Sequence, residues 1–587
     1  MKRMTVCCIL VLVFAAEVWA DSPQMMSVMG EVKHPLTLSL EELGKLESES
    51  VRLNEVFRDS GFHGVFRYRG PSLRALLELA VIQKQDTDFT KAIDLAIVVR
   101  NKDRQQVSLS WGEVFYRNPA DVIIATQAAP VMPHAECKQC HEPEIYEPWF
   151  NELQRPVGLP KLVIANDFYT DRCLEDITSI EVVDLHPDIH GEKKERLFSP
   201  AFTICGQVEK PLTFDSVASY PHFEVMSKQA GDGRGYHGLK KFSGASLGTL
   251  LTEAKIKSSL SSVVLVSAPD GYRSLLSYGE LFLSPYAQNV IVADAMDGAP
   301  IDDDGKFCMV TLDDLSADRC VKAVEKIEVI ELVETPKLYI IGVGCAEANL
   351  ITLEAISCFA KADAFVCSED LKKRFTRYIG DKPVLFDPIQ SLEKTFHRGD
   401  PNLSEQQRKE LLRKQRATEA QKVINALKEG KTVAYMDYGD PMIFGSWRFL
   451  QDFVDNSLME IVPGISSFNV ASALIKRDIT CNGSVVITAP QDLKAKESMI
   501  QAVAECGDTL AIFMGLKDFE NLVPLLRKYY PETTPVCLVY EAGFTGKERV
   551  IRTTLHEAPE VARQEKEKWL GLIYIGPCLE SISSSCK

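Results

Sequence analysis

The sequence predicts a multidomain protein in which two β-rich α+β units precede a larger α/β domain. Three observations lead to this prediction. The chain has 587 residues, which is enough for roughly three to five domains of ordinary size. Its first half contains one set of short motifs twice in the same order. After Pro336, closely spaced short strands give way to alternating strands and helices.

The composition is that of a globular chain with an acidic surface. Hydrophobic residues make up 45% and charged residues 25%, which excludes a disordered or collagen-like chain. The net charge of -16 repels phosphate backbones, so we expect no nucleic-acid partner. The 16 cysteines are too sparse for a disulfide scaffold.

Residues 1–20 are typical of an export signal. Lys2 and Arg3 form a basic start, a mainly apolar stretch runs from Thr5 to Val18, and Ala20 offers a plausible cleavage point. The apolar stretch is too short for a comfortable membrane span. We therefore expect an exported, periplasmic chain; the alternative is an uncleaved signal that anchors the protein.

A duplicated unit fills the first half of the chain. Gly30–Thr37 and Gly206–Thr213 share the pattern Gly-x-Val-x-x-Pro-Leu-Thr. The other pairs are Gly61–Val65 with Gly235–Leu239, Gly70–Leu73 with Gly244–Leu247, Trp111–Glu113 with Tyr278–Glu280, and Asp171–Cys173 with Asp318–Cys320. Ordered matches with slowly drifting spacing indicate duplication with loop changes. We place the repeats at 21–182 and 203–333, with a linker at 183–202.

Each repeat combines short strands with short helices. Alternating apolar residues predict strands over Ala92–Arg100 and Ser262–Ala268. Helices are predicted over Ser72–Leu79 and Ser246–Glu253.

This arrangement resembles the molybdopterin-binding domain of the sulfite-oxidase-like family. Family members place a molybdenum-ligating cysteine before the Gly-x-Ser-Leu helix start. Here Val51–Gly70 and Glu224–Gly244 contain no cysteine, and a soft metal site needs a thiolate. The repeats are therefore interpreted as a retained scaffold without molybdopterin. His63 and His237 are equivalent; they could ligate a metal, bind an anion or only stabilise a turn.

An insertion in the first repeat carries a haem attachment motif. The spacing drift locates about 20 additional residues there, and they include Cys137-Lys138-Gln139-Cys140-His141. In a c-type haem site, Cys137 and Cys140 would form the thioethers and His141 would ligate the iron. A sixth ligand, where one exists, would come from Met132, His134, His186 or His190. The alternatives are a disulfide between the two cysteines or half of a zinc site; a haem would imply a redox partner.

The second half, from Pro336 onward, is predicted to be α/β. Apolar runs predict strands at Leu338–Val343, Ala364–Cys367 and Thr432–Met436. Helices are predicted at Leu353–Ala360 and Arg413–Leu427.

Five motifs in this half resemble the tetrapyrrole methylase family. They are Tyr339–Gly344 with Leu350–Leu353, Gly439–Gly445, Val462–Ser467, Thr509–Gly515, and a late motif formed by Thr534–Val536 and Glu541–Gly543. The resemblance implies a methylase domain of two subdomains at 336–580, which transfers a methyl group from S-adenosylmethionine (SAM) to a cobalamin- or sirohaem-type precursor. It also implies a homodimer formed through this domain.

The resemblance further implies which residues contact SAM. They are Gly342, Gly344, Gly439, Asp440, Ile443, Ser466, Ser467, Met514 and Gly543. Glycines after strand ends let the backbone approach a ligand, and an apolar methionine can line an adenine pocket. Methyl transfer is a direct displacement that needs mainly alignment, so we name no general base. The same motifs could instead serve only to maintain the fold.

Two departures from the family pattern affect this interpretation. The first motif, usually Gly-x-Gly-Pro-Gly-Asp, ends here in Cys345-Ala346-Glu347, and Arg448 stands later than the arginine of the second motif. These changes indicate altered substrate handling or lost catalysis.

SAM is cytoplasmic, whereas the signal predicts export. Either the signal is misread, the domain only binds a tetrapyrrole, or an exported SAM pool exists. The leading hypothesis is a methyltransferase; the alternative is an exported c-type haem protein that binds a porphyrinoid without methylating it.

Overall fold

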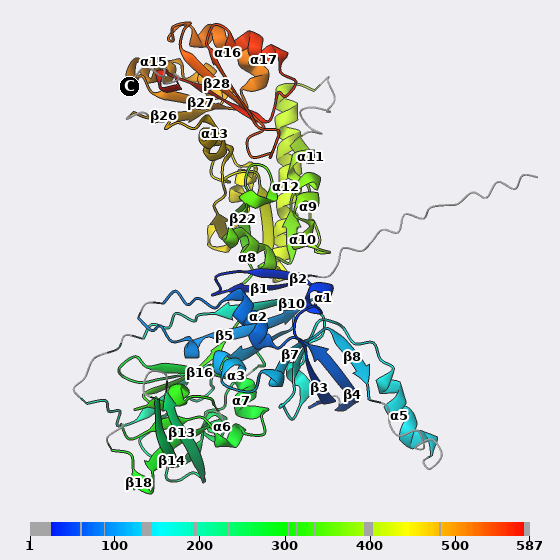
Figure 1. Ribbon diagram of the computed structural model, residues 1–587, viewed down its shortest axis with the longest axis vertical. Helices are drawn as coiled ribbons and strands as arrows, with labels where there is room; N and C mark the ends of the chain where they lie inside the picture. The colour runs from blue at the N-terminus through cyan, green and yellow to red at the C-terminus, as the bar shows by residue number, and fades with distance from the viewer. Residues whose placement is uncertain are drawn as a thin grey trace, which may run out of the picture.

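The computed structural model describes residues 25–58, 61–86, 88–131, 142–189, 191, 196–231, 235–257, 259–302, 305–312, 314–333, 335–392, 403–480 and 483–579. Figure 1 shows an elongated molecule with two β-rich units at one end and two α/β subdomains stacked beyond them. The predicted signal at residues 1–20 and the motif Cys137–His141 lie outside the described residues. Within the described part of the chain, no helix combines the length and apolar character needed to cross a bilayer.

The first unit is built on a five-stranded sheet of order β2-β1-β10-β5-β6. Its strands are β1 (Met25–Gly30), β2 (Leu36–Ser39), β5 (Ala96–Asn101), β6 (Gln106–Ser110) and β10 (Ile177–Val183). Strands β1 and β10 are parallel, and the other neighbours are antiparallel. Around this sheet lie α1 (Leu40–Leu43), β3 (Glu49–Phe57), β4 (Gly61–Gly70), α2 (Leu73–Ala80), α3 (Trp111–Phe115), β7 (Val122–Ala125), β8 (Gln127–Pro130), α5 (Pro143–Leu153) and β9 (Lys161–Ile164).

The second unit repeats this plan with a sheet of order β12-β11-β21-β15-β16. Its strands are β11 (Phe202–Gly206), β12 (Leu212–Phe214), β15 (Ser262–Ser267), β16 (Arg273–Ser277) and β21 (Lys326–Glu331). Around them lie β13 (His222–Gly231), β14 (Gly235–Ser246), α6 (Leu247–Glu253), α7 (Tyr278–Phe282), β17 (Ile291–Met296), β18 (Ala299–Pro300), β19 (Cys308–Val310) and β20 (Val321–Lys322). The duplicated motifs therefore belong to two copies with the same strand order and the same parallel pair, β11 with β21.

Most predicted elements of the repeats are confirmed to within one residue, with one exception. The strand expected from Ala92 begins only at Ala96, because Ala92–Asp94 forms a turn of 3₁₀ helix. The buried carboxylate of Asp94 accepts hydrogen bonds from Lys84 at 2.7 Å and from Arg273 at 2.8 Å. This polar anchor, which the apolar pattern does not reveal, takes Asp94 out of the strand.

The repeated motifs also form the joint between the two units. Arg172 of the first unit is fully buried, and its Nη2 lies 2.6 Å from Oε1 of Glu113. Its Nη1 lies 3.3 Å from Oγ of Ser277 in the second unit. A Cβ atom at Gly279 would lie 1.9 Å from the guanidinium carbon of Arg172, so only glycine fits beneath this arginine.

The same contacts recur with the units exchanged. Arg319 of the second unit is paired with Glu280 at 2.7 Å and donates to Oγ of Ser110 at 2.9 Å. A Cβ atom at Gly112 would lie 2.3 Å from the side chain of Arg319. Each unit therefore inserts one arginine into the other. Because the contacts are exchanged in this way, the interface between the units is nearly two-fold symmetric.

The second half of the chain contains two sheets. The first, of order β23-β24-β22-β25, is entirely parallel. Its strands are β22 (Leu338–Gly342), β23 (Ala364–Val366), β24 (Val433–Asp437) and β25 (Met459–Val462). The second, of order β26-β27-β30-β28-β29, has one parallel pair, β26 with β27. Its strands are β26 (Val485–Thr488), β27 (Thr509–Phe513), β28 (Pro535–Tyr540), β29 (Arg549–Thr554) and β30 (Gly571–Ile575).

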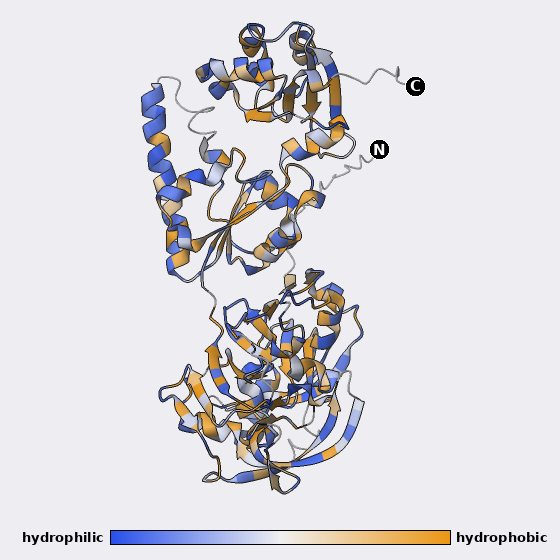
Figure 2. Ribbon diagram, turned by 90° about the vertical axis from the view of Figure 1, so that its left-hand side faces the viewer, coloured by the Kyte–Doolittle hydropathy of each residue, from blue (hydrophilic) through white to orange (hydrophobic). Residues whose placement is uncertain are grey.

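Helices cover these sheets. They are α8 (Leu353–Lys361), α9 (Glu369–Arg374), α10 (Thr376–Ile379), α11 (Pro388–Leu392), α12 (Glu405–Lys428), α13 (Ser467–Ile475), α14 (Pro490–Ala495), α15 (Glu497–Cys506), α16 (Phe519–Leu526) and α17 (Ala558–Gln564). The predicted strands and α8 are confirmed to within a residue. Helix α12 starts eight residues before the predicted Arg413, because its first turns are polar and rely on the capping box of Ser404 and Gln407. Figure 2 shows α12 as a mostly hydrophilic helix along one side.

Candidate functional site

The predicted SAM-contacting residues gather at the carboxyl ends of the parallel strands. Gly342 ends β22, Gly439 follows β24, and Gly464 follows β25. Open parallel sheets bind ligands at this end, outside the carboxyl ends of their strands. Figure 1 places the edge between the two α/β subdomains.

Three glycines bring these loops into backbone contact. A Cβ atom at Gly342 would lie 2.6 Å from the Gly464 nitrogen and 2.7 Å from the Gly439 oxygen. A Cβ atom at Gly464 would lie 2.2 Å from that same oxygen. Gly439 has φ of +69°, and its N–H donates to the Gly344 oxygen at 3.0 Å. No larger side chain fits at Gly342 or Gly464, so the three loops pack backbone against backbone, with Gly342 and Gly439 buried.

The rest of the second motif is fixed by its own hydrogen bonds. Oδ1 of Asp440 accepts a hydrogen bond from the Met442 N–H at 2.8 Å. Ile443 packs against the apolar core of the second subdomain, whereas Met442 and Phe444 are exposed. The loop therefore presents apolar side chains on one side while Ile443 anchors it on the other.

Ser466 and Ser467 begin helix α13. Ser466 is buried, and its Oγ accepts a hydrogen bond from the Phe468 N–H at 3.2 Å. Ser467 is the first residue of the helix. A Cβ atom at Gly439 would lie 3.5 Å from Cα of Ser466, so the helix start lies directly against the second motif.

The second subdomain supplies Met514 and Gly543. Met514 follows β27 with φ of +53° and an exposed side chain. Gly543 has φ of +88°, and a Cβ atom there would lie 2.8 Å from both Cβ of Ala346 and Cδ1 of Leu350. The late motif therefore touches the turn that follows the first motif. The Phe513 and Phe444 rings, 5.3 Å apart, bridge the subdomains near Met514.

The unusual turn after Gly344 is ordered by contacts with the second subdomain that the sequence did not predict. The Glu347 carboxylate accepts hydrogen bonds from the Thr545 N–H at 3.0 Å and from its hydroxyl at 2.8 Å. Sγ of Cys345 lies 3.7 Å from the Ala542 oxygen. Burial raises the pKa of Cys345 to about 11, so this thiol stays protonated at neutral pH. Only the departure of Glu347 from the family pattern pointed to this contact.

Local hydrogen bonds explain why Arg448 stands later than the arginine of the family's second motif. Ser446 donates its N–H to Oδ2 of Asp437 at 2.8 Å. The buried Trp447 donates its indole N–H to the Pro441 oxygen at 2.8 Å. These two residues close the loop of the second motif, and Arg448 is exposed.

In the β-rich half, the two predicted histidines lie in different surroundings. Nδ1 of His63 is 3.8 Å from a carboxylate oxygen of Glu152, and its ring meets Phe57 edge-on at 5.0 Å. His237 is exposed on β14. Among the described residues, no three His, Cys, Asp or Glu side chains converge as a metal site would require.

The two repeats differ in the polarity of one interior position. Glu55 and Gln229 are the bulged residues of the equivalent hairpins. Glu55 is fully buried and bonded to Tyr68, Lys161 and Arg155. In the second repeat, the equivalents of Glu55, Tyr68 and Lys161 are Gln229, Phe242 and Cys308, which help to line a cavity of about 1030 Å³. A charged cluster thus occupies in one copy the space that is open in the other.

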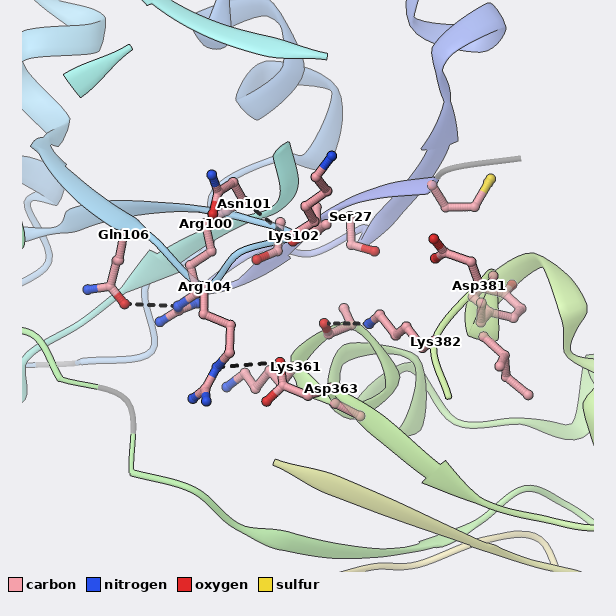
Figure 3. A pocket seen from close by; sticks show the side chains of 18 of the residues that line it. Ser27, Arg100, Asn101, Lys102, Arg104, Gln106, Lys361, Asp363, Asp381 and Lys382 are labelled. Carbon is pink, nitrogen blue, oxygen red and sulfur yellow. Dashed lines mark hydrogen bonds and ion pairs between the residues drawn. The ribbon is translucent and has the colours of Figure 1, made fainter. Parts of the chain in front are cut away.

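A second cavity, of about 600 Å³, separates the first repeat from the α/β half. Figure 3 shows Arg100 and Arg104 on the side of the first repeat and Lys361 and Asp363 on the side of the α/β half. Beside it, Glu181 lies 2.7 Å from Nη1 of Arg100 and 2.8 Å from Nζ of Lys361. Burial alone would raise the pKa of Glu181, but these two cations outweigh burial and hold that pKa below its usual range.

Comparison with known proteins finds relatives of the C-terminal half. Residues 337–559 match the sequence model of the family Tetrapyrrole (Corrin/Porphyrin) Methylases. This match agrees with the resemblance to tetrapyrrole methylases that the five motifs predicted for this half. The match does not include the β-rich half, so its sulfite-oxidase-like character and its haem remain predictions.

Two curated relatives align with this domain over most of their length. A uroporphyrinogen-III C-methyltransferase of Methanocaldococcus jannaschii is 26% identical over 259 residues, which are 43% of this chain and 99% of that protein. A cobalt-precorrin-4 C(11)-methyltransferase of the same organism is 27% identical over 252 residues, which are 41% of this chain and 88% of that protein. Among solved structures, a uroporphyrin-III C-methyltransferase of Thermus thermophilus complexed with S-adenosylhomocysteine is 20% identical, covering 41% of this chain and 98% of that chain with a TM-score of 0.30.

Proposed function

We propose that the C-terminal half binds SAM and transfers its methyl group to a carbon of a tetrapyrrole, a precursor of the cobalamin or sirohaem type. The observation that carries this proposal is the three-way backbone contact of Gly342, Gly439 and Gly464 at the carboxyl ends of the parallel strands. The methylase domain match and the two C-methyltransferase relatives support it.

The chain's own residues would bind and orient the donor. SAM supplies a methyl group on a sulfonium, which a nucleophilic carbon displaces directly. The glycine loops let peptide groups approach the donor without interference from a Cβ atom. Met514 offers an exposed, polarisable side chain to an apolar part of it. Rate enhancement then comes from alignment and from exclusion of water.

Apolar side chains around the same loops suit the acceptor. Met442 and Phe444 of the second motif and Ile465 of the Pro-Gly-Ile-Ser segment are exposed, with Met442 at 64%. Exposed apolar patches on a folded domain commonly mark binding sites. A flat macrocycle offers a matching apolar face.

Calorimetry with SAM and S-adenosylhomocysteine on the full chain tests donor binding. We expect dissociation constants near micromolar, which correspond to a binding free energy of about -8 kcal/mol. Gly439→Val should abolish this heat, because valine disfavours the left-handed φ and covers the peptide surface. Gly507→Val is the matched control: Gly507 has a similar φ of +72° at the end of α15, so this variant should lose stability but keep the affinity. Absence of heat with either ligand for the wild type contradicts the proposal.

Binding without methylation is the alternative. The changed turn at Cys345-Ala346 favours it, since that turn lies against Gly543. A chain that binds a porphyrinoid tightly but gives no heat with S-adenosylhomocysteine would support this alternative.

We also propose that the chain is exported, on the evidence of residues 1–20. Cys578 takes part in a disulfide, which suits an oxidising compartment. Several other cysteines of this half, including Cys367 and Cys537, are buried thiols that suit either compartment.

A further inference from the structure

Arg374 is the last residue of α9 and lies where the methylase motifs meet. Its side chain is 17% exposed. One guanidinium nitrogen, Nη1, donates to the Ala346 oxygen in the altered turn. The other, Nη2, lies 2.7 Å from Oδ2 of Asp370, one turn earlier in the helix. Arg374 thus ties helix α9 to the turn that follows the first motif.

Two aromatic rings flank the same guanidinium. Its central carbon lies 5.9 Å from the ring centre of Tyr438 and 5.7 Å from that of Phe544. A cation within this range of a ring is attracted by the negative face of the π system. Tyr438 precedes Gly439, and Phe544 follows Gly543. One side chain therefore reaches the first motif, the Gly-Asp-Pro motif and the late motif, which come from both subdomains.

The surroundings of Arg374 are themselves fixed. The Tyr438 hydroxyl lies 2.8 Å from Oγ of Ser368 and 3.3 Å from the Asp370 carboxylate. Ser368 also caps α9 by accepting a hydrogen bond from the Leu371 N–H at 3.3 Å. Asp370 therefore holds Tyr438 and Arg374 together, so the ring and the guanidinium keep one geometry.

The turn that Arg374 holds lacks the restraint that a proline would give. Proline fixes φ in a turn, whereas Cys345-Ala346 can rotate. The turn is held instead by side-chain contacts: Arg374 on the Ala346 oxygen and Glu347 on Thr545.

We propose that Arg374 is a positioning residue of the donor site, which keeps the Cys345-Ala346 turn and the Gly439 and Gly543 loops at the spacing that SAM binding requires. The inference rests on the proposed function. Arg374 acts through the loops that it holds. Its loss should therefore loosen the turn locally and weaken donor binding while the sheets remain folded.

The test compares full-length wild type with Arg374→Met and Arg374→Lys, using Arg377→Met as control. Arg377 lies on the next helix, and its partners, Thr37 and Glu42, belong to the first repeat. We expect Arg374→Met to weaken S-adenosylhomocysteine binding by about tenfold or more in calorimetry. Arg374→Lys keeps the cation between the rings and should recover part of the affinity. Arg377→Met should bind like the wild type.

A second readout separates positioning from general instability. The rate at which an alkylating reagent modifies Cys345, followed by mass spectrometry, should rise several-fold in Arg374→Met. Modification of the core residue Cys537 should stay as slow as in the wild type. Phe544→Leu removes one ring and leaves the hydrogen bonds, so it should weaken binding less than Arg374→Met; it is also the substitute if that variant does not fold.

The outcomes are distinguishable. A wild type that gives no heat overturns the proposed function together with this inference. A wild type that binds, with Arg374→Met binding equally well and Cys345 equally protected, overturns the inference alone. Equal loosening of Cys345 and Cys537 would show a structural role only and also overturn it.

Discussion

At the scale of single residues, the candidate donor site depends on what glycine lacks. Gly342 and Gly464 approach backbone atoms so closely that a methyl group would overlap them. Gly439 and Gly543 adopt left-handed φ values that other residues rarely adopt. These four positions let the backbones of three strand ends and a late turn approach one another closely. Close backbone contacts of this kind can therefore be predicted from a sequence, because the glycines that form them occur in motifs with a fixed order.

The predicted haem is the second residue-scale question. Expressed with c-type maturation factors, the protein should keep its Soret band after acid–acetone extraction, because thioether bonds survive that treatment. Replacing Cys137 and Cys140 by alanine together should remove the band. His141→Ala should leave the porphyrin attached and change the iron spin state.

Intact mass provides the opposing outcome for the haem. An exported and matured wild type that shows only the unmodified polypeptide mass would exclude covalent haem. The loop would then hold a disulfide or no bond at all.

The residues that hold the donor site were less predictable than those that form it. Gly342, Gly439 and Gly543 follow from motif order. By contrast, Arg374 lies in a helix without a motif, and Thr545 pairs with Glu347 from the other subdomain. Such contacts depend on how two subdomains face each other. A single sequence does not contain that information.

At the scale of elements, duplication predicted two copies but not how they join. Matching motifs located equivalent helices and strands because both copies keep the same apolar periodicity. The exchange of Arg172 and Arg319 between the units was not predictable, because the motif Asp-Arg-Cys shows no partner. The structure shows that each arginine joins its own glutamate to a serine of the other unit. The motifs shared by the two copies therefore include the residues that form the interface between them.

The charged cluster of the first repeat gives an element-scale prediction. Lys161→Met should destabilise the protein by about 3–5 kcal/mol, because it leaves Glu55 buried without its ammonium partner. The double variant Glu55→Gln with Lys161→Cys introduces the residues of the second repeat and removes both charges. It should recover much of the loss. Urea unfolding of the full chain measures all three proteins.

The double variant also provides the contrary outcome. Equal destabilisation by the single and double variants would mean that packing volume matters at this position rather than an unpaired charge. An unaffected Lys161→Met would mean that Arg155 alone balances Glu55.

At the scale of the whole molecule, the α/β half meets the repeats through hydrogen bonds and ion pairs. Arg104 donates to the Glu429 oxygen at 3.1 Å, and Arg377 donates to the Thr37 oxygen at 2.7 Å. Glu181 joins Arg100 to Lys361 beside the cavity of Figure 3. The three units were predicted from the sequence. This contact was not, because its residues are scattered over strands β2, β5 and β10, helices α8 and α10, and the turns that follow β5 and α12.

The prediction at this scale concerns Lys361. Lys361→Met removes the ion pair that links the α/β half to Glu181, so the α/β half should unfold at a lower temperature than it does in the wild type in calorimetry. The pKa of Glu181 is lowered in the folded state. Its contribution is therefore present above the unfolded pKa, about 4.3, and is lost as pH falls through the folded value. The difference between wild type and Lys361→Met should accordingly be full at pH 7 and shrink below pH about 4. Lys337→Met is the control. Lys337 pairs with Glu460 inside the α/β half at 2.5 Å, and both side chains are about 40% exposed. Because an exposed ion pair contributes little to stability, this variant should leave the unfolding temperature of the α/β half unchanged. A Lys361→Met profile that matches the wild type at pH 7 would show that the two halves are joined by other contacts.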